Sequence, residues 1–250
     1  MWQGPAKTQT IAKNLVGMFS TNDPGPNRLT LDRVEARGES FDGKTVDVLA
    51  ISRSTFERCV FSDFNLKWAG FGGSSQSVFR RCVFDSMTIA DSVPGNVRFE
   101  ECDFSRAHLK KWLSFSAEYV RCRFSGRIDQ GFIWARDDDL KKRTRRTTNE
   151  VLDNDFRECL LGDFSFRGGV ELKRHLLPDG PGYLWIPDLK AFVTSIDSAE
   201  SGANPLSVAW GWLSVLRLSL KGGQRQYFGR PDEPPPAWMV GAVREAGAEF

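Results

Sequence analysis

The sequence has little of what an enzyme, a membrane protein or a disulfide-bonded domain requires. It contains two histidines in 250 residues, and the common phosphate-binding, serine-hydrolase and zinc-protease motifs do not occur. Its five cysteines show no Cys-x-x-Cys spacing, and their odd number argues against a disulfide framework. The most apolar segment, 206–220, contains Arg217 and is too short to span a bilayer.

Further absences in the sequence narrow the cellular location and the chemistry that we expect for the protein. The N-terminus lacks the apolar stretch of a secretory signal, so we expect a soluble cytoplasmic protein without membrane contact. His108 falls at an outward position of the repeat described below, and His175 stands beside a Pro/Gly turn; the sequence identifies no partner for either. We therefore expect no catalytic residue, no metal and no cofactor.

All five cysteines lie in one repeated phrase. An aromatic residue stands three positions before each cysteine and an apolar residue two positions after it. The cysteines are Cys59, Cys82, Cys102, Cys122 and Cys159. Since the middle three are 20 residues apart, the underlying step is five, which is the period of neither a helix nor a strand. Such a period indicates a repeat architecture.

Large residues, mostly apolar, can be followed in steps of five along most of the chain. The first run is Leu31, Ala36, Phe41, Val46, Ile51, Phe56, Phe61, Leu66 and Phe71. The second is Phe79, Phe84, Ile89, Pro94, Phe99, Phe104, Leu109, Ser114, Tyr119 and Phe124. The third is Val151, Phe156, Leu161 and Phe166. Only Pro94 and Ser114 depart from the pattern in the second run, and smaller residues often stand two positions before each centre.

A chain that turns a quarter circle every five residues explains this pattern. Four segments then make one coil, every centre points inward, and successive coils stack about 4.8 Å apart through parallel backbone hydrogen bonds. Each coil contacts only its neighbours. The expected core includes Phe56, Cys59, Phe61, Phe79, Cys82, Phe84, Phe99, Cys102, Phe104, Cys122, Phe124, Phe156 and Cys159.

The repeat resembles that of the bacterial pentapeptide-repeat family, written A-(D/N)-L-x-x. The best matches are Phe64-Asn65-Leu66, Ala107-His108-Leu109 and Cys102-Asp103-Phe104. The resemblance implies a mainly β fold, a right-handed quadrilateral parallel β-helix (a solenoid), here in a Phe- and Cys-rich variant. Segments 154–156, 166–172, 177–180 and 223–226 resemble an uncharacterised subgroup of the family with a helical tail, for which no catalytic role is implied.

We expect three regions. Residues 1–30 are predicted to cap the first coil, 31–172 to form the β-helix, and 173–250 to form a mainly helical cap or dimerisation region. Residues 130–150 interrupt the repeat and fit either one degenerate coil or a protruding loop. The helix predicted after Asn204-Pro205 is apolar around most of its circumference, so it should be buried. Its contacts, either in the cap or in a homodimer, would come from Trp210, Trp212, Leu213, Leu216 and Leu220.

Charge separates the functional hypotheses. Relatives that protect DNA gyrase from quinolones are thought to mimic DNA, which requires a strongly acidic rod. Residues 31–172 contain 23 Lys and Arg against 23 Asp and Glu, which disfavours simple mimicry unless the charges separate by face. A basic run follows Asp137-Asp138-Asp139, and its residues are Lys141, Lys142, Arg143, Arg145 and Arg146. This run is either a solvated loop that pairs with its acidic neighbour or a contact for an anionic partner.

Three functions remain open. The first is a non-enzymatic protein-interaction module, a rigid rod that docks a protein partner. The second is protection of a type II topoisomerase by DNA mimicry, in antibiotic or toxin resistance, and the third is nucleic-acid contact through 141–146. We rank them in this order, because few aromatic residues interleave with the basic run and no acidic excess is present.

Overall fold

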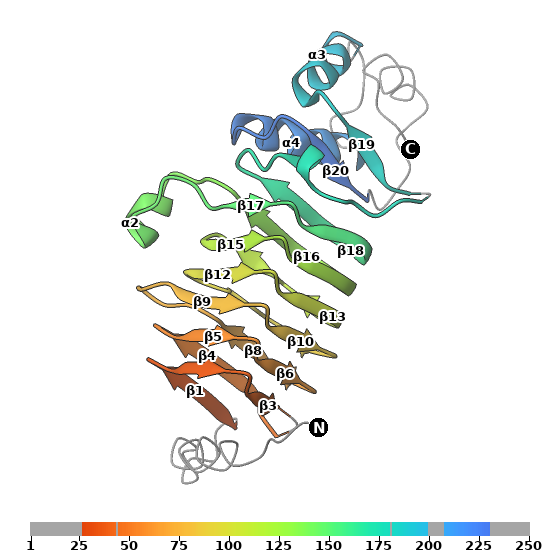
Figure 1. The fold of residues 1–250 in the computed structure, drawn as a ribbon. Helices are drawn as coiled ribbons and strands as arrows, with labels where there is room; N and C mark the ends of the chain where they lie inside the picture. Colours follow the sequence, from red (N-terminus) through yellow and green to blue (C-terminus); the bar gives the residue numbers. More distant parts are fainter. Residues whose placement is uncertain (1–26, 44, 181, 200–207, 231–250) are drawn as a thin grey trace.

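A computed structural model describes residues 27–43, 45–180, 182–199 and 208–230. The described residues form a tall stack of parallel β-coils, followed by a smaller helical region at the end of the rod (Figure 1). This confirms the prediction of a mainly β, four-sided parallel β-helix. The predicted cap segment up to residue 26, and residues 231–250 of the predicted helical region, lie outside the described residues.

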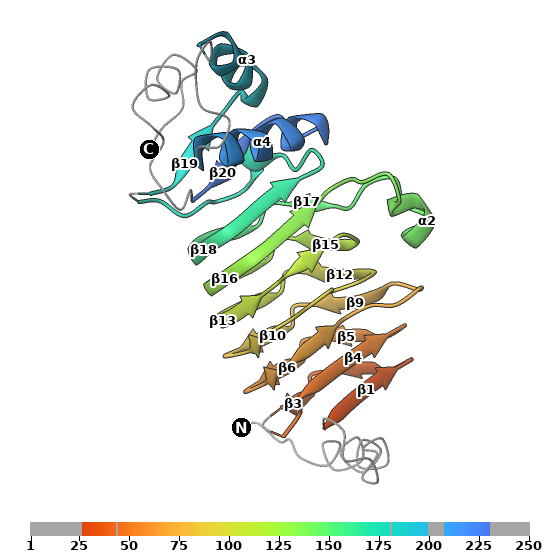
Figure 2. The ribbon, with the colours of Figure 1, turned by 180° about the vertical axis from the view of Figure 1, so that it is seen from behind.

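The chain turns at four corners per coil, which gives the rod four faces (Figures 1 and 2). Face 1 contains β1 (Arg28–Asp32), β4 (Val48–Ser52), β8 (Trp68–Gly70), β14 (Leu113–Ser114) and the last residues of β16 (Arg123–Trp134) and β18 (Asp155–Arg167). Face 2 contains β2 (Glu35–Arg37), β5 (Thr55–Glu57), β9 (Ser77–Arg80), β12 (Val97–Glu100), β15 (Ala117–Val120) and β17 (Val151–Leu152).

The other two faces share long strands that continue around a corner. Face 3 contains β3 (Ser40–Asp42), β6 (Val60–Ser62), β10 (Val83–Asp85) and the first residues of β13 (Asp103–Lys110), β16 and β18. Face 4 contains β7 (Asn65–Leu66), β11 (Thr88–Ile89) and the middle or later residues of β13, β16 and β18. Neighbouring strands on every face are parallel, as stacked coils require.

Parallel, in-register pairing places identical side chains above one another inside the rod. One column of stacked rings contains Phe41, Phe61, Phe84, Phe104, Phe124 and Phe156, with successive centroids 4.6–5.1 Å apart. A second contains Phe56, Phe79, Phe99 and Tyr119. All thirteen residues of the expected core are buried. The spacing of the rings follows the strand spacing, so each ring is in van der Waals contact above and below.

Trp112 explains why Ser114 can break the pattern of large apolar centres. Its ring is fully buried and lies 6.2 Å from that of Phe104, so it occupies the axis where a small serine leaves space. The indole Nε1 donates to the Tyr119 hydroxyl at 2.9 Å, and that hydroxyl donates to Ser114 Oγ at 3.1 Å. The polar atoms of this level are therefore paired with one another inside the core.

Several corners of the coil have a left-handed backbone at residues with long side chains. Arg58, Arg81 and Arg121 have φ of 53°, 53° and 54° at the corner between faces 2 and 3. Each such residue costs about 1–2 kcal/mol of backbone energy. From this corner the side chain of Arg81 reaches Glu101 of the next coil at 2.7 Å. At Gly126 only glycine fits, because a Cβ would lie 2.3 Å from the Ala107 carbonyl oxygen.

The interruption at 130–150 contains both a coil and a loop. β16 continues through residues 130–134 and pairs with β18, so these residues belong to a coil. Residues after Trp134 then leave the rod, form the short helix α2 (Leu140–Thr144) and return to β17 (Figure 1). β1 also begins at Arg28, three residues before the start of the coil region that the sequence suggests.

The C-terminal region packs on the last coil. It contains η1 (Leu172–Arg174), the antiparallel pair β19 (Leu184–Ile186) and β20 (Tyr227–Gly229), α3 (Leu189–Ala199) and α4 (Val208–Lys221). The buried Gln224 joins it to the rod, since its side chain accepts hydrogen bonds from the Gly169 and Val170 amides and donates to the Val170 carbonyl. Among the described residues, none of the helices has the length and apolar character needed to cross a membrane.

Candidate interaction surfaces

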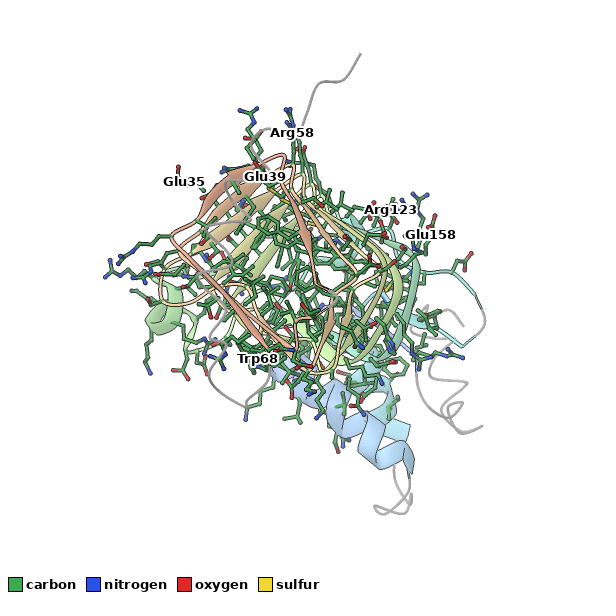
Figure 3. All side chains as sticks on the ribbon, turned by 90° about the horizontal axis from the view of Figure 1, so that it is seen from below. Glu35, Glu39, Arg58, Trp68, Arg123 and Glu158 are labelled. Atoms are coloured by element: carbon green, nitrogen blue, oxygen red, sulfur yellow. The ribbon has the colours of Figure 1, made fainter. Side chains whose placement is uncertain are left out.

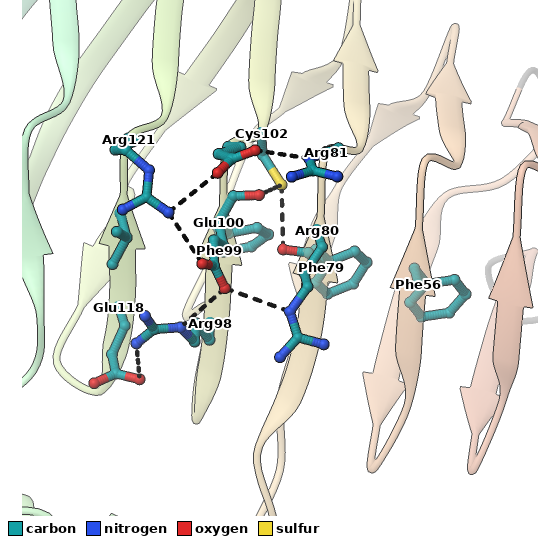
Figure 4. A network of polar contacts seen from close by, with 12 residues as sticks. Phe56, Phe79, Arg80, Arg81, Arg98, Phe99, Glu100, Cys102, Glu118 and Arg121 are labelled. Atoms are coloured by element: carbon teal, nitrogen blue, oxygen red, sulfur yellow. Dashed lines mark hydrogen bonds and ion pairs between the residues drawn. The ribbon is translucent and has the colours of Figure 1, made fainter.

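Face 2 carries a ladder of ion pairs that runs across successive coils (Figure 4). Glu100 is the centre of it, with contacts to Arg80 at 3.4 Å, Arg98 at 3.5 Å and Arg121 at 3.1 Å. Hydrogen bonds from Arg81 and then from Arg121 lower the pKa of the neighbouring Glu101. Exposed pairs of this kind stabilise by about 0–1 kcal/mol each, so their main effect is to neutralise the face.

Face 3 is also mixed in sign. Two acidic side chains of this face are paired with arginines: Asp85 with Arg106, and Asp103 with Arg123 at 3.8 Å. Arg123 also binds Glu158 at 2.7 Å, and both are seen on this side of the rod in Figure 3. None of the outward strand rows that the structure describes is acidic over three successive coils. A continuous acidic stripe, which DNA mimicry requires, is therefore not found on the described faces.

The predicted basic contact at 141–146 is largely paired within the chain. Lys142 binds Asp139 at 2.8 Å, and Arg143 binds Asp137. These pairs neutralise the acidic and basic runs against each other, as the solvated-loop interpretation expects. Lys141 and Arg145 are exposed, and within the described residues they form no ion pair.

Arg146, the last residue of the basic run, has a structural position. Its guanidinium donates to Asn96 Oδ1 at 3.1 Å and to the Ser116 carbonyl at 2.7 Å, and it lies 3.4 Å from the buried Glu118. Burial lowers the pKa of Arg146, although Glu118 opposes that shift. Asn149 completes the attachment, because its Nδ2 donates to two carbonyl oxygens of neighbouring coils. Together these residues fix the protruding segment against the corner of faces 1 and 2.

An arginine–aromatic cluster lies beside this segment on face 1. It consists of Phe115, Phe132, Trp134, Arg143 and Arg167. Phe115 packs edge-on against Phe132 at 4.8 Å and against Trp134 at 5.4 Å. The guanidinium of Arg143 lies 5.6 Å from the Phe115 centroid, and that of Arg167 lies 4.7 Å from the Phe132 centroid. These aromatic side chains point outward from the coil and are only partly buried.

The apolar character of face 1 continues below the cluster. In the outward row, Leu113 pairs with Phe132, and Val93 of the coil below is 40% exposed. Further down, Trp68 is 38% exposed and its ring lies over Gly70. Figure 3 shows Trp68 on the opposite side of the rod from Arg123. Asp91 and Lys111 form one ion pair at 3.9 Å in the row of Trp68, but the row of Val93, Leu113 and Phe132 carries no charge, whereas charged pairs dominate faces 2 and 3.

The predicted cap or dimer contacts of α4 divide into two groups. Leu213 and Leu216 are buried, and Leu220 is partly buried, against a cluster that includes Ile186 and Phe192. Trp210 and Trp212 lie in α4, but their side chains are outside the described residues. One side of this helix is not covered within the described residues, since Val215 is 42% and Leu218 67% exposed. Burial of that side in a homodimer stays a prediction.

The cysteines of the core are stacked thiols with little reactivity expected. All five are free and buried. The hydrogen bond with Cys102, then burial, raises the pKa of Cys82 to about 12, and burial raises that of Cys159 to about 12. A thiol held neutral in this way is a poor nucleophile and a poor metal ligand. Among the described residues, no group of three or more His, Cys, Asp or Glu is placed to hold a metal ion.

The two histidines have structural partners that the sequence does not reveal. His108 lies 3.2 Å from Asp129 on face 4. His175 is buried beneath the C-terminal region, where its Nδ1 accepts a hydrogen bond from the Asn154 amide at 3.1 Å and its ring stacks on Phe166. Burial lowers the pKa of His175 to about 4. It borders a pocket of about 340 Å³ lined also by Tyr183, but no carboxylate or nucleophile hydrogen-bonds to its ring in the described part of the chain.

Comparisons with known proteins add little to these observations. No protein-family model and no curated protein matches the chain. A solved structure of QnrB1, described as a plasmid-mediated fluoroquinolone resistance protein, matches with a TM-score of 0.25 and 16% identity over 59% of this chain and 79% of that chain. A likeness at that TM-score carries no functional argument.

Proposed function

We propose that this chain is a non-enzymatic protein-interaction module that presents its rigid β-helical rod to a protein partner. The observation that carries the proposal is the outward surface of face 1. Aromatic and aliphatic side chains, including Trp68, Val93 and Phe132, lie there in successive coils, whereas faces 2 and 3 carry paired charges. An exposed apolar row bordered by polar faces is typical of a docking surface.

The five-residue period supports placing the chain with the pentapeptide-repeat family as part of this proposal. Five free thiols in the core suit a reducing compartment, so we place the protein in the cytoplasm. The exposed Val215 and Leu218 of α4 are the residues through which a homodimer would form.

The two other hypotheses have less support. Topoisomerase protection by DNA mimicry needs an acidic stripe, and the described faces carry mixed charges instead. Nucleic-acid contact through the basic run needs several free cations, yet Lys142 and Arg143 are paired and Arg146 is anchored to the rod. Within the described residues this leaves Lys141 and Arg145 without an ion pair.

Affinity capture of the full chain from cells of its own host, followed by mass spectrometry, tests the proposal. We expect a discrete protein to be recovered with and without nuclease treatment, and its recovery to fall when Trp68 and Val93 are both replaced by serine. Recovery of nucleic acid alone, or of a protein whose binding is indifferent to these changes, would contradict the proposal.

A further inference from the structure

We infer that the arginine–aromatic cluster of face 1 binds an acidic protein segment that carries apolar anchor side chains. This inference rests on the proposed function and specifies the chemistry of the partner. The cluster combines the two residue types, aromatic and arginine, that are most often energetically dominant in protein interfaces.

Three outward aromatic rings form the apolar part of this surface. Phe115, Phe132 and Trp134 contact one another on the outside of the coil, with centroids 4.8–5.7 Å apart, and remain partly exposed. Leu113 extends the same surface toward Val93. A partner side chain such as Leu or Phe that covers these rings would gain about 1.5–3 kcal/mol from burial.

The preference for an acidic partner follows from positive charge on this surface that no carboxylate compensates. Arg167 donates from Nε to Ser165 Oγ at 2.8 Å, but within the described residues it forms no ion pair. Its guanidinium is half-buried over Phe132, and burial lowers its pKa. Lys141 and Arg145 add two exposed cations on and next to α2. A carboxylate bound bidentately to Arg167 would compensate this charge.

The geometry favours a protein segment over a nucleic acid. Single-stranded nucleic acids bind through bases that stack on open aromatic faces. Here the guanidinium groups of Arg143 and Arg167 already lie over Phe115 and Phe132. Arg143 is already paired with Asp137, so the Arg167 guanidinium is the one that stays available for a carboxylate, while the partly exposed rings of Phe132 and Trp134 stay available for aliphatic side chains.

Selection from an unbiased peptide library tests the inference with the full chain. Random 12-residue peptides displayed on phage are selected against the wild type, and the enriched sequences are synthesised and measured by fluorescence anisotropy. We expect enriched peptides to combine Asp or Glu with Leu, Phe or Trp. Their affinity should fall about tenfold in Arg167→Gln, the loss of roughly one charge-assisted interaction.

Two matched variants separate the cluster from general effects. Arg123→Gln removes an arginine from the opposite face and should leave affinity unchanged. Arg167→Glu should bind peptides in which lysine replaces the acidic residues better than the wild type does. Circular dichroism and thermal unfolding show that each variant is folded.

Several results would overturn the inference. Enriched peptides that are neutral or basic would do so, as would acidic peptides that bind Arg167→Gln as tightly as the wild type. If a 12-nucleotide single strand binds and loses affinity in Arg167→Gln, the cluster is a nucleic-acid site instead. Peptides weakened by Trp68→Ser but not by Arg167→Gln would overturn this inference and leave the proposed function standing, whereas peptides weakened only by Arg123→Gln, or a selection without any binder, would contradict both.

Discussion

The ring of Phe104 stacks on that of Phe124 with centroids 4.7 Å apart and planes 2° from parallel. The two residues are 20 positions apart in the chain and directly paired in register on face 3. Their contact shows how the rod is built, because each level of the core is stabilised by the same residue type above and below it. A cavity at one level therefore removes contacts on both sides.

Phe104→Ala should lower the free energy of unfolding by about 3–5 kcal/mol, since it opens a cavity in the middle of the column. Urea denaturation followed by circular dichroism measures the change. Lys110→Ala, at an exposed residue without an ion pair among the described residues, should change stability by less than about 0.5 kcal/mol. Equal effects of the two substitutions would show that Phe104 does not line the axis.

The buried pair of Trp112 and Tyr119 should behave as a coupled unit. Tyr119→Phe leaves the Trp112 Nε1 hydrogen without an acceptor, and Trp112→Phe removes the donor, so each should cost about 1–3 kcal/mol. The double variant should be less destabilised than the sum of the two, because the unpaired group is then absent as well. A double-mutant cycle in urea measures this coupling, and strict additivity would show that the hydrogen bond contributes nothing.

The five cysteines should be inert in the folded protein. Because the pKa of Cys82 and of Cys159 is raised to about 12, both thiols stay protonated at pH 8. Ellman's reagent should react slowly with the native chain and rapidly with all five thiols in guanidinium chloride. Fast stoichiometric labelling of a native thiol would place that cysteine outside the core.

His175 should make stability depend on pH below neutrality. Its pKa in the folded chain, about 4, lies below the ordinary value of 6.5, so the unfolded chain binds more protons between these values. Stability from this group is complete above about pH 6.5 and is lost as the pH falls toward 4, by on the order of 2 kcal/mol at pH 5.

His175→Gln keeps an acceptor for the Asn154 amide and removes the titration. Unfolding free energies of this variant and the wild type at pH 7 and pH 5 measure the difference. His108→Gln, on face 4, serves as the control. Because this variant retains His175, it should still show the loss of stability that His175 causes between pH 7 and pH 5. The same loss on acidification in His175→Gln and wild type would assign the effect to other groups.

The period of five was sufficient to predict the coil because inward centres such as Phe104 repeat without regard to local helix or strand propensity. It missed Trp112, which stands at the position normally occupied by a smaller residue, two before the centre Ser114. At that level the large and small residues are exchanged. A search that follows only the centres therefore finds a break at this level, although a large side chain still fills the axis.

The site was harder to predict for a related reason. Phe115, Phe132 and Trp134 meet only because the coil between them is one residue short, as the register shift near Gly126 shows. Outward residues have no periodic constraint, so their alignment across coils depends on each insertion and deletion. The pairing of Asp139 with Lys142, in contrast, follows from the short spacing along the chain, and the sequence indicated it.

Site-specific photo-crosslinking in the native host tests the central claim, that face 1 is the docking face. A photoreactive aromatic residue is placed at Trp68 and, in a matched variant, at Arg123 on the opposite side of the rod. The account predicts a cross-link from position 68 to one discrete protein and none from position 123. Cross-links to that protein from position 123 alone, or to nucleic acid alone, would contradict it.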